Sequence, residues 1–267
     1  MSSSFKNPFI VADLISKTAE AKNSLKTSNL ILLSFLAGAY ISFGALLAEV
    51  ATSGMADAGI PLGLEKFVFG AVFPLGLILV VLAGSELFTG NIMYMTIGVL
   101  QKTASLKGLL KNWTFTWVFN FAGALFIAFV IAYLGGVMPT DPSALGYIIT
   151  QKAIAVAESK IAMPIHVAII KGIGCNWLVC LGLWLAISSD DVIGKIVGVW
   201  FPVMAFVTIG FEHSIANMYF LFLGVFLGAN VDLYSIFVNN LIPVTVGNII
   251  GGALFVGCIY WYTYLRK

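Results

Sequence analysis

The sequence predicts an all-α integral membrane protein with six transmembrane helices, arranged as an inverted repeat of three plus three with broken second and fifth helices. Composition, the lengths of the apolar segments and an internal repeat support this prediction. With 60% apolar residues, 10% charged residues and a mean hydropathy of +1.00, the 267-residue chain has more apolar surface than a soluble domain can bury. The net charge of +2 and the scattered lysines give no reason to expect a nucleic-acid partner.

An amphipathic helix is expected first, as a separate segment over residues 1–28. Asn7 and Pro8 are typical of a helix cap followed by proline at the first helical position. Four apolar residues then share one face: Ile10, Val11, Leu14 and Ile15. We expect about four turns of helix lying on the membrane surface as an anchor. A movable plug over a pore mouth is the alternative.

Six apolar segments follow within residues 29–267, each long enough to cross a bilayer, which takes roughly 20 apolar residues. They cover about 30–51, 64–100, 113–137, 165–188, 195–228 and 242–265. The second and fifth exceed the required length by about ten residues or more and carry glycines and polar groups at their centres. Both are therefore interpreted as broken helices.

The distribution of lysine and arginine predicts the orientation. With the N-terminus inside, ten of the 14 basic residues are cytoplasmic: Lys6, Lys17, Lys22, Lys26, Lys102, Lys107, Lys111, Lys195, Arg266 and Lys267. Lys66, Lys152 and Lys160 fall outside, and Lys171 stays within a span, where it could extend to the outer interface without any function. The positive-inside rule thus predicts a multi-pass protein of the cell membrane with both termini cytoplasmic.

An internal repeat relates two parts of the chain, about 29–137 and 165–267. The pattern Gly84-x-Glu86-x-x-x-Gly90-Asn91 recurs 126 positions later as Gly210-x-Glu212-x-x-x-Ala216-Asn217. Phe73-Pro74 and Asn120-x-x-Gly123 recur 128 positions later as Phe201-Pro202 and Asn248-x-x-Gly251. Because each unit holds three spans, an odd number, its two copies must cross the membrane in opposite directions. Inverted repeats of this kind place a solute site near the midplane.

His213 is the only histidine deep within an apolar segment. An ionisable group at bilayer depth costs about 2.5–3.5 kcal/mol on insertion scales, so it usually faces a protein interior or a solute path. A buried structural histidine is the alternative. The position at a predicted helix break favours a solute site.

Four strings resemble the formate/nitrite transporter family, most closely its formate transporters. They are Asn7-Pro8-Phe9, Leu87-Phe88-Thr89, Gly210-Phe-Glu-His-Ser-Ile-Ala-Asn-Met218 and Asn240-Leu-Ile-Pro-Val-Thr-Val-Gly-Asn-Ile-Ile-Gly-Gly252. The resemblance covers essentially the whole chain. It implies an aquaporin-like protomer of six helices, assembled as a homopentamer in the lipid bilayer, with a separate anion path through each protomer.

The resemblance also implies roles for individual residues. His213 matches the family's central histidine, which faces the passing anion, and Thr89 matches a threonine whose hydroxyl donates to the substrate or to the histidine. A protonated or hydrogen-bonding imidazole would lower the cost of the anion at the midplane and could hand it a proton. Thr89 as a helix-capping residue is the alternative. Gly84 and Gly90 on either side of Thr89 would give the loop backbone freedom.

Further positions match the walls of the family's path. Apolar constrictions correspond to Phe73, Leu77, Leu87 and Phe206, which would exclude hydrated ions. Lys160 matches a basic residue of the outer vestibule that draws anions in, and Asn176 matches a polar residue facing the path.

Two carboxylates of the repeat are interpreted as structural. A carboxylate lining an anion path would repel its substrate, so Glu86 and Glu212 are expected to accept hydrogen bonds from freed backbone N–H groups at the breaks, helped by Asn91 and Asn217. Asn120 and Asn248 precede glycines in close-packed helices, which favours interhelical hydrogen bonds.

Three functions compete at this point. A channel or transporter for formate and related small monovalent anions, proton-linked through His213, explains the repeat and the constrictions; nitrite or hydrosulfide is the alternative solute within the family. A neutral-solute pore shares the inverted architecture, but neither break has an Asn-Pro-Ala signature. An intramembrane enzyme using Glu212 and His213 would need further ligands or a nucleophile that no motif supplies, so neither catalysis nor a metal or other cofactor is expected.

Overall fold

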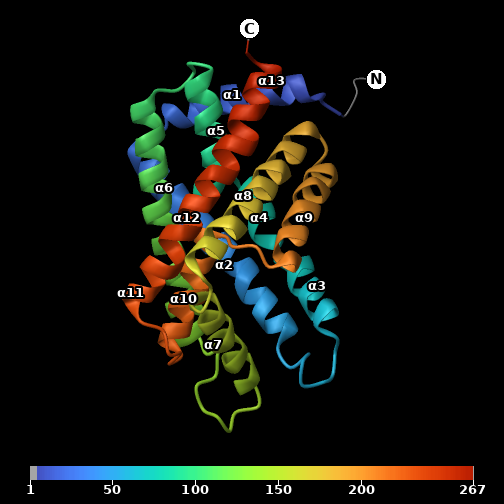
Figure 1. Cartoon of the computed structure of the whole chain (residues 1–267), viewed down its shortest axis with the longest axis vertical. Coiled ribbons are helices and arrows are strands. Elements are labelled where there is room, and N and C mark those ends of the chain that lie inside the picture. The colour runs from blue at the N-terminus through green and yellow to red at the C-terminus, as the bar shows by residue number, and fades with distance from the viewer. Residues whose placement is uncertain (1–4, 267) are drawn as a thin grey trace.

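The computed structural model describes residues 5–266, and the regular secondary structure within this range is helical apart from a single β-bridge between Phe5 and Ser189 (Figure 1). Lys267 and the first four residues of the predicted N-terminal segment lie outside the described residues. The elements are α1 (Pro8–Asn23), α2 (Thr27–Thr52), α3 (Leu62–Val72), α4 (Leu75–Leu79), η1 (Val80–Gly84), α5 (Phe88–Leu100), α6 (Leu106–Phe126), η2 (Ile127–Leu134), α7 (Tyr147–Ile161), α8 (Ile165–Ser188), α9 (Val192–Ile209), α10 (Ser214–Phe226), α11 (Leu233–Ser235), η3 (Ile236–Leu241), α12 (Ile242–Ile250), η4 (Gly251–Cys258) and α13 (Ile259–Tyr264), where η marks π-helical turns.

The six predicted spans are confirmed. Within residues 5–266, six continuous helical stretches are long and apolar enough to cross a membrane: Thr27–Thr52, Leu62–Gly84, Leu106–Leu134, Ile165–Ser188, Val192–Ile209 and Leu233–Tyr264. The two ends of the described chain lie at the same end of the bundle (Figure 1).

The second and fifth spans are broken, as predicted. The stretch α3–η1 ends at Gly84 (φ 80°), and α9 ends at Gly210 (φ 86°). Both are left-handed conformations that glycine adopts without steric cost, so the two glycines end equivalent half-helices. Short helices of 13 residues each, α5 and α10, resume after the breaks.

Two glycine contacts bring pairs of long helices close together. A Cβ on Gly38 of α2 would lie 1.9 Å from the carbonyl oxygen of Asn120 in α6. In the second half, a Cβ on Gly251, which directly follows α12, would lie 2.3 Å from the carbonyl oxygen of Ile173 in α8. Small residues at such positions allow helix backbones to touch inside a membrane. We call these two contacts the glycine seams.

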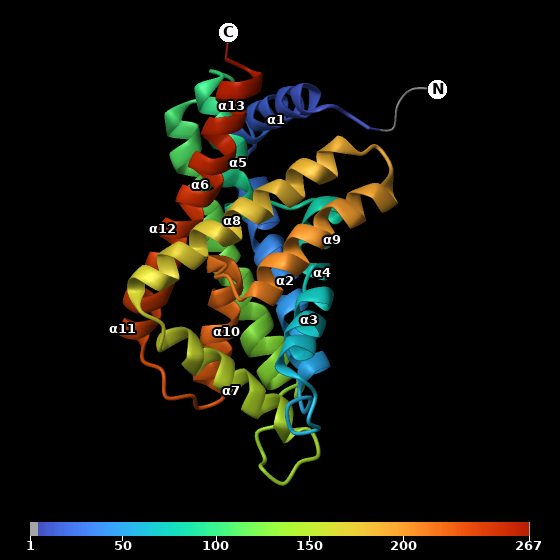
Figure 2. The same ribbon diagram turned by 45° about the vertical axis from the view of Figure 1, so that its right-hand side comes forward.

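Helix α1 lies across the end of the bundle, close to α13 and α5 (Figure 2). It begins at Pro8 with the Asn7 side chain accepting the Ile10 N–H, which confirms the predicted cap. The predicted apolar face is only partly correct, because Val11 and Ile15 are buried whereas Ile10 is 43% exposed. The buried face includes Ser16, whose hydroxyl group is hydrogen-bonded to the Thr103 hydroxyl in the α5–α6 loop.

Helix α7 was not predicted. It covers the end of the bundle opposite the termini (Figure 1) and buries Thr150, Ala153 and Ala157. Two lysines of α7 form ion pairs with residues of the broken spans, Lys152 with Glu65 and Lys160 with Glu212. These pairs tie α7 to both broken spans.

Candidate functional site

Thr89 and His213 meet where the two short helices begin. Thr89 lies in the first turn of α5, and His213 is the N-cap residue of α10. The Thr89 hydroxyl oxygen and His213 Nε2 are 3.0 Å apart, and the two residues are 0% and 4% exposed. The structure therefore brings together two of the four polar residues that were predicted to line the substrate path.

The second ring nitrogen of His213 determines which groups donate. His213 Nδ1 accepts the Ala216 N–H at 3.1 Å, so it carries no hydrogen of its own. In a neutral ring the hydrogen is then on Nε2, which donates to the Thr89 hydroxyl oxygen. The Thr89 hydroxyl hydrogen remains available for a solute. An imidazolium would place a second N–H against the Ala216 donor, so the geometry supports the hydrogen-bonding imidazole.

Helix ends add to the positive potential at this pair. The N-termini of α5 and α10 both lie at the Thr89–His213 contact. Each N-terminus carries the equivalent of about half a positive charge, which favours an anion in front of it. The arrangement can hold a small anion by hydrogen bonds without a metal.

Asn120 and Asn248 hold the two breaks in the same way. Asn120 accepts the Phe88 N–H and donates to the carbonyl oxygens of Ser34 and Glu86. Asn248 accepts a backbone N–H of α10 and donates to two backbone carbonyl oxygens, one of them in α8. The predicted interhelical hydrogen bonds are confirmed, and they supply the partners that the broken backbone needs inside a membrane.

The carboxylates of the repeat also make matched contacts, but with side chains. Glu86 binds Lys22 Nζ and Asn91 Nδ2, both at 2.7 Å. The expectation that this carboxylate accepts freed backbone N–H groups is wrong. Asn120 already satisfies that backbone, which leaves the carboxylate free to pair with a lysine.

Glu212 repeats this pattern on the other side. Both of its carboxylate oxygens lie 3.0 Å from Lys160 Nζ, and one accepts from Asn217 Nδ2 at 2.6 Å. The predicted backbone contacts are absent among the described residues here too. The structural interpretation of Glu86, Asn91, Glu212 and Asn217 agrees with these contacts.

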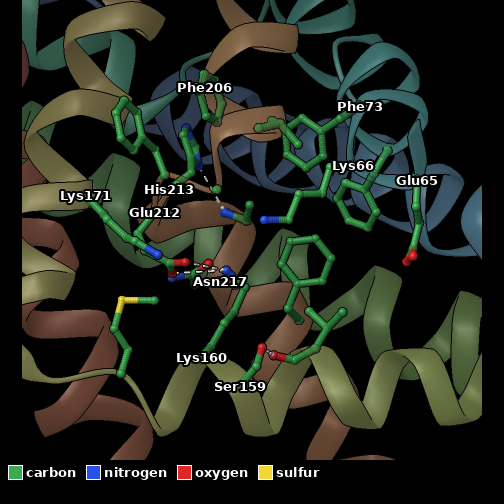
Figure 3. A pocket seen from close by; sticks show the side chains of 18 of the residues that line it. Glu65, Lys66, Phe73, Ser159, Lys160, Lys171, Phe206, Glu212, His213 and Asn217 are labelled. Atoms are coloured by element: carbon green, nitrogen blue, oxygen red, sulfur yellow. Dashed lines mark hydrogen bonds and ion pairs between the residues drawn. The ribbon is translucent and has the colours of Figure 1, made fainter. Parts of the chain in front are cut away.

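Two cavities approach the central pair from opposite directions. The α7-side vestibule has a volume of about 400 Å³ and reaches Phe73, Phe206 and His213 (Figure 3). The α1-side vestibule has a volume of about 370 Å³ and reaches Leu87 and Gly90.

Three of the four side chains predicted as constrictions border these cavities, and their role as constrictions stays a prediction. Phe73 and Phe206 line the α7-side vestibule beside His213 with ring centroids 6.3 Å apart, and the Phe206 ring stacks on His213. Leu87 borders the α1-side vestibule, and Leu77 is buried without lining either cavity. Apolar side chains thus border the cavities on both sides of the polar pair.

Some predicted site residues are placed differently. Asn176 is fully buried and lines neither vestibule, because its amide donates to the carbonyl oxygens of Thr89 and Asn248. Asn176 therefore holds the backbone at Thr89 instead of facing the path. Gly90 lies within α5, where a Cβ would meet Leu183 at 2.6 Å, so its role is packing and not loop freedom.

Two contacts were missed by the sequence analysis. Lys22 of α1 reaches the Glu86 carboxylate, a contact that no local pattern indicates. Glu49 of α2 is fully buried and accepts a hydrogen bond from the Tyr219 hydroxyl at 3.0 Å. A carboxylate inside the first apolar span was a signal of the same kind as His213.

A polar pair enclosed by apolar side chains between two open cavities suits the passage of a solute, so the fold and site define a multi-pass membrane channel or transporter. The chain belongs to the formate/nitrite transporter family, whose model matches residues 10–262. This confirms the resemblance found in the sequence.

Individual relatives agree with the family assignment. A probable formate transporter of Methanothermobacter thermautotrophicus is 55% identical over the full length of both chains. The formate channel BtFdhC of Bacillus thuringiensis is 40% identical, covering 98% of this chain and 97% of its own. A solved pentameric formate channel with formate bound has a TM-score of 0.76 and 34% identity, covering 89% of this chain and 97% of its own. The likeness to aquaporins stays a prediction.

Proposed function

We propose that this protein carries formate and related small monovalent anions across the cell membrane, through a path in each protomer of a homopentamer. The observation that carries the proposal is the Thr89–His213 pair at the meeting point of two helix N-termini. The choice of formate as the solute and of a pentamer as the assembly rests on the names of the relatives.

The central pair lowers the cost of an anion through two donors. A solute anion replaces the Thr89 oxygen as acceptor for His213 Nε2–H, and the Thr89 hydroxyl donates a second bond. Hydrogen bonds to a charged group are worth about 1.5–3 kcal/mol each. A proton taken up with the anion would further ease its passage between the apolar side chains, so the proposal includes proton-linked flux.

Other solutes are less well supported. Nitrite or hydrosulfide could use the same two donors, but the similar proteins described above are named as formate transporters or formate channels. A neutral-solute pore does not require lysines in excess over carboxylates in both vestibules.

Transport is proposed in place of catalysis. The Glu212 carboxylate is occupied by Lys160 and Asn217, and His213 by Thr89 and Ala216, so the two do not form an acid–base pair.

The positive-inside rule places the α1 side in the cytoplasm and the α7 side outside. In this proposal residues 1–28 are a cytoplasmic surface helix and residues 29–267 form the transporter domain, with repeats of about 29–137 and 165–267.

The test is uptake of labelled formate into proteoliposomes at several pH values, with nitrite and acetate as competitors. His213→Asn keeps a side chain that can cap α10 but lacks the Nε2 donor, whereas His213→Ala loses both functions. Thr89→Val removes only the hydroxyl. We expect saturable uptake by the wild type that rises as external pH falls, and a loss of about tenfold or more in His213→Asn and Thr89→Val, as expected for one bond to a charged group.

Either of two results would overturn the proposal. Folded wild type that passes water or glycerol but no anion would support the neutral pore. Full formate flux in both His213→Asn and Thr89→Val would show that the pair does not hold the solute.

A further inference from the structure

The α7-side vestibule is lined by more lysines than its carboxylates pair with. Four lysines and two glutamates line it, and Figure 3 labels all of them except Lys152: Lys66, Lys152, Lys160, Lys171, Glu65 and Glu212. Lys160, the residue expected to attract anions, is held by both oxygens of Glu212. Lys152 is held by Glu65. Two positive charges remain uncompensated.

Lys66 carries one of the two uncompensated positive charges. It is exposed, forms no ion pair or hydrogen bond with the described residues, and extends from α3 into the cavity (Figure 3). Phe73 of the constriction follows it by seven residues, two helical turns, so both side chains lie on the same face. Seven residues of helix rise about 10 Å, which places Lys66 at the approach to the constriction.

Lys171 carries the second uncompensated positive charge. It lines the same cavity from α8, on the side of Glu212 away from Lys160 in the view of Figure 3. Its ammonium group forms no ion pair with any residue from 5 to 266, since the Glu212 carboxylate is engaged by Lys160 and Asn217. One carboxylate thus faces two ammonium groups, and a positive charge is left over beside the path.

The α1-side vestibule has a smaller excess. Its lining contains Lys22, Lys195 and Glu86. Lys22 pairs with Glu86, and Lys195 donates to the carbonyl oxygen of Ala186. One uncompensated charge on this side compares with two on the α7 side, so an anion is drawn more strongly to the α7 side.

We infer that Lys66 and Lys171 form an anion-capture site in the α7-side vestibule, which concentrates small monovalent anions in front of the Phe73–Phe206 constriction. This rests on the proposed function, and it assigns the capture step to the unpaired lysines instead of Lys160. A lining that carries excess charge of one sign raises the local concentration of the opposite ion.

The experiment compares the apparent KM for formate uptake at low and high ionic strength. The variants are Lys66→Gln, Lys171→Gln, the double variant and the double arginine variant, with Lys107→Gln as the control. Lys107 is exposed at the start of α6 and lines neither vestibule. The single variant Lys66→Gln removes no partner from another residue, so it tests the site even if the double variant does not fold.

We expect the apparent KM at low salt to rise by roughly threefold for each lysine removed, the effect of one unit charge a few ångströms away in water. The arginine variant should keep the wild-type KM. Salt should raise the KM of the wild type but not of the double variant, because the Debye length falls from about 30 Å at 0.01 M to about 8 Å at 0.15 M.

An unchanged KM and salt response in Lys66→Gln and in the double variant, with saturable wild-type uptake, would overturn this inference alone. A wild type that moves no anion would refute the proposed function and the inference with it.

Discussion

Replacing Asn248 with alanine should destabilise the fifth-span break. Its buried side chain binds the Ser214 N–H and the carbonyl oxygens of Glu212 and Gly172, at 2.9, 3.0 and 2.9 Å. Hydrogen bonds between membrane helices average about 0.6 kcal/mol, so three lost bonds lower the free energy of unfolding by at least about 2 kcal/mol. If each orphaned group costs its full desolvation penalty of about 1–3 kcal/mol, the loss approaches about 9 kcal/mol.

The assay follows thermal unfolding in detergent with a thiol-reactive fluorophore. Cys175 and Cys180 are buried and become reactive only on unfolding, and Cys258→Ala removes the partly exposed thiol from the background. A loss of about 2 kcal/mol lowers the midpoint by about 4 °C or more in a chain of this size. Asn120→Ala should give a similar decrease, because its contacts match those of Asn248.

Asn230→Ala is the control for these measurements. It lies in an exposed loop, and its side-chain amide makes no hydrogen bond with the described residues. If Asn248→Ala unfolds at the same temperature as this control, the amide does not hold the break, and the matched hydrogen bonds carry no stability.

Two further substitutions test the packing and the buried carboxylate. Gly38→Ala should abolish folded protein, because the new Cβ would overlap a backbone carbonyl of α6. Gly63→Ala in α3 is the control and should be tolerated, because its Cβ would meet no atom within 4 Å. The yield of monodisperse protein measures both effects, and equal yields would contradict the glycine seam. Tyr219→Phe removes the only hydrogen bond to the Glu49 carboxylate within the described chain and should cost about 1–3 kcal/mol in the same thermal assay. Adding Glu49→Leu should recover most of that loss, whereas additive losses would argue against the contact.

The spans and their breaks could be predicted because they depend on local properties. Lengths of apolar sequence and a three-span repeat are sufficient to locate six helices and two interruptions. Helix α7 was not predicted because its 15 residues are too polar to span a membrane. Only its contacts in the folded chain explain its position.

The site could be predicted only in part. His213 was found from its depth in an apolar segment, and Thr89 from family resemblance. The partner of a charged side chain depends on the whole fold: Lys160 is 52 positions from Glu212, and Lys22 is 64 positions from Glu86. The family resemblance therefore assigned Lys160 to anions, whereas in the folded chain Lys160 pairs with the Glu212 carboxylate. The buried Glu49 could have been noticed by the same argument as His213.

The glycine seams have a consequence for motion. Helices whose backbones touch cannot slide or tilt without breaking that contact, since packed interfaces are not continuously deformable. The frame around the path is therefore stiff, and large rearrangements of helices, which take microseconds or longer, are not the expected means of opening. The Phe73 and Phe206 rings can be displaced without moving a helix backbone, because both are side chains that line the α7-side vestibule. In the proposed function, passage of a solute then depends on displacement of these two rings inside a fixed scaffold.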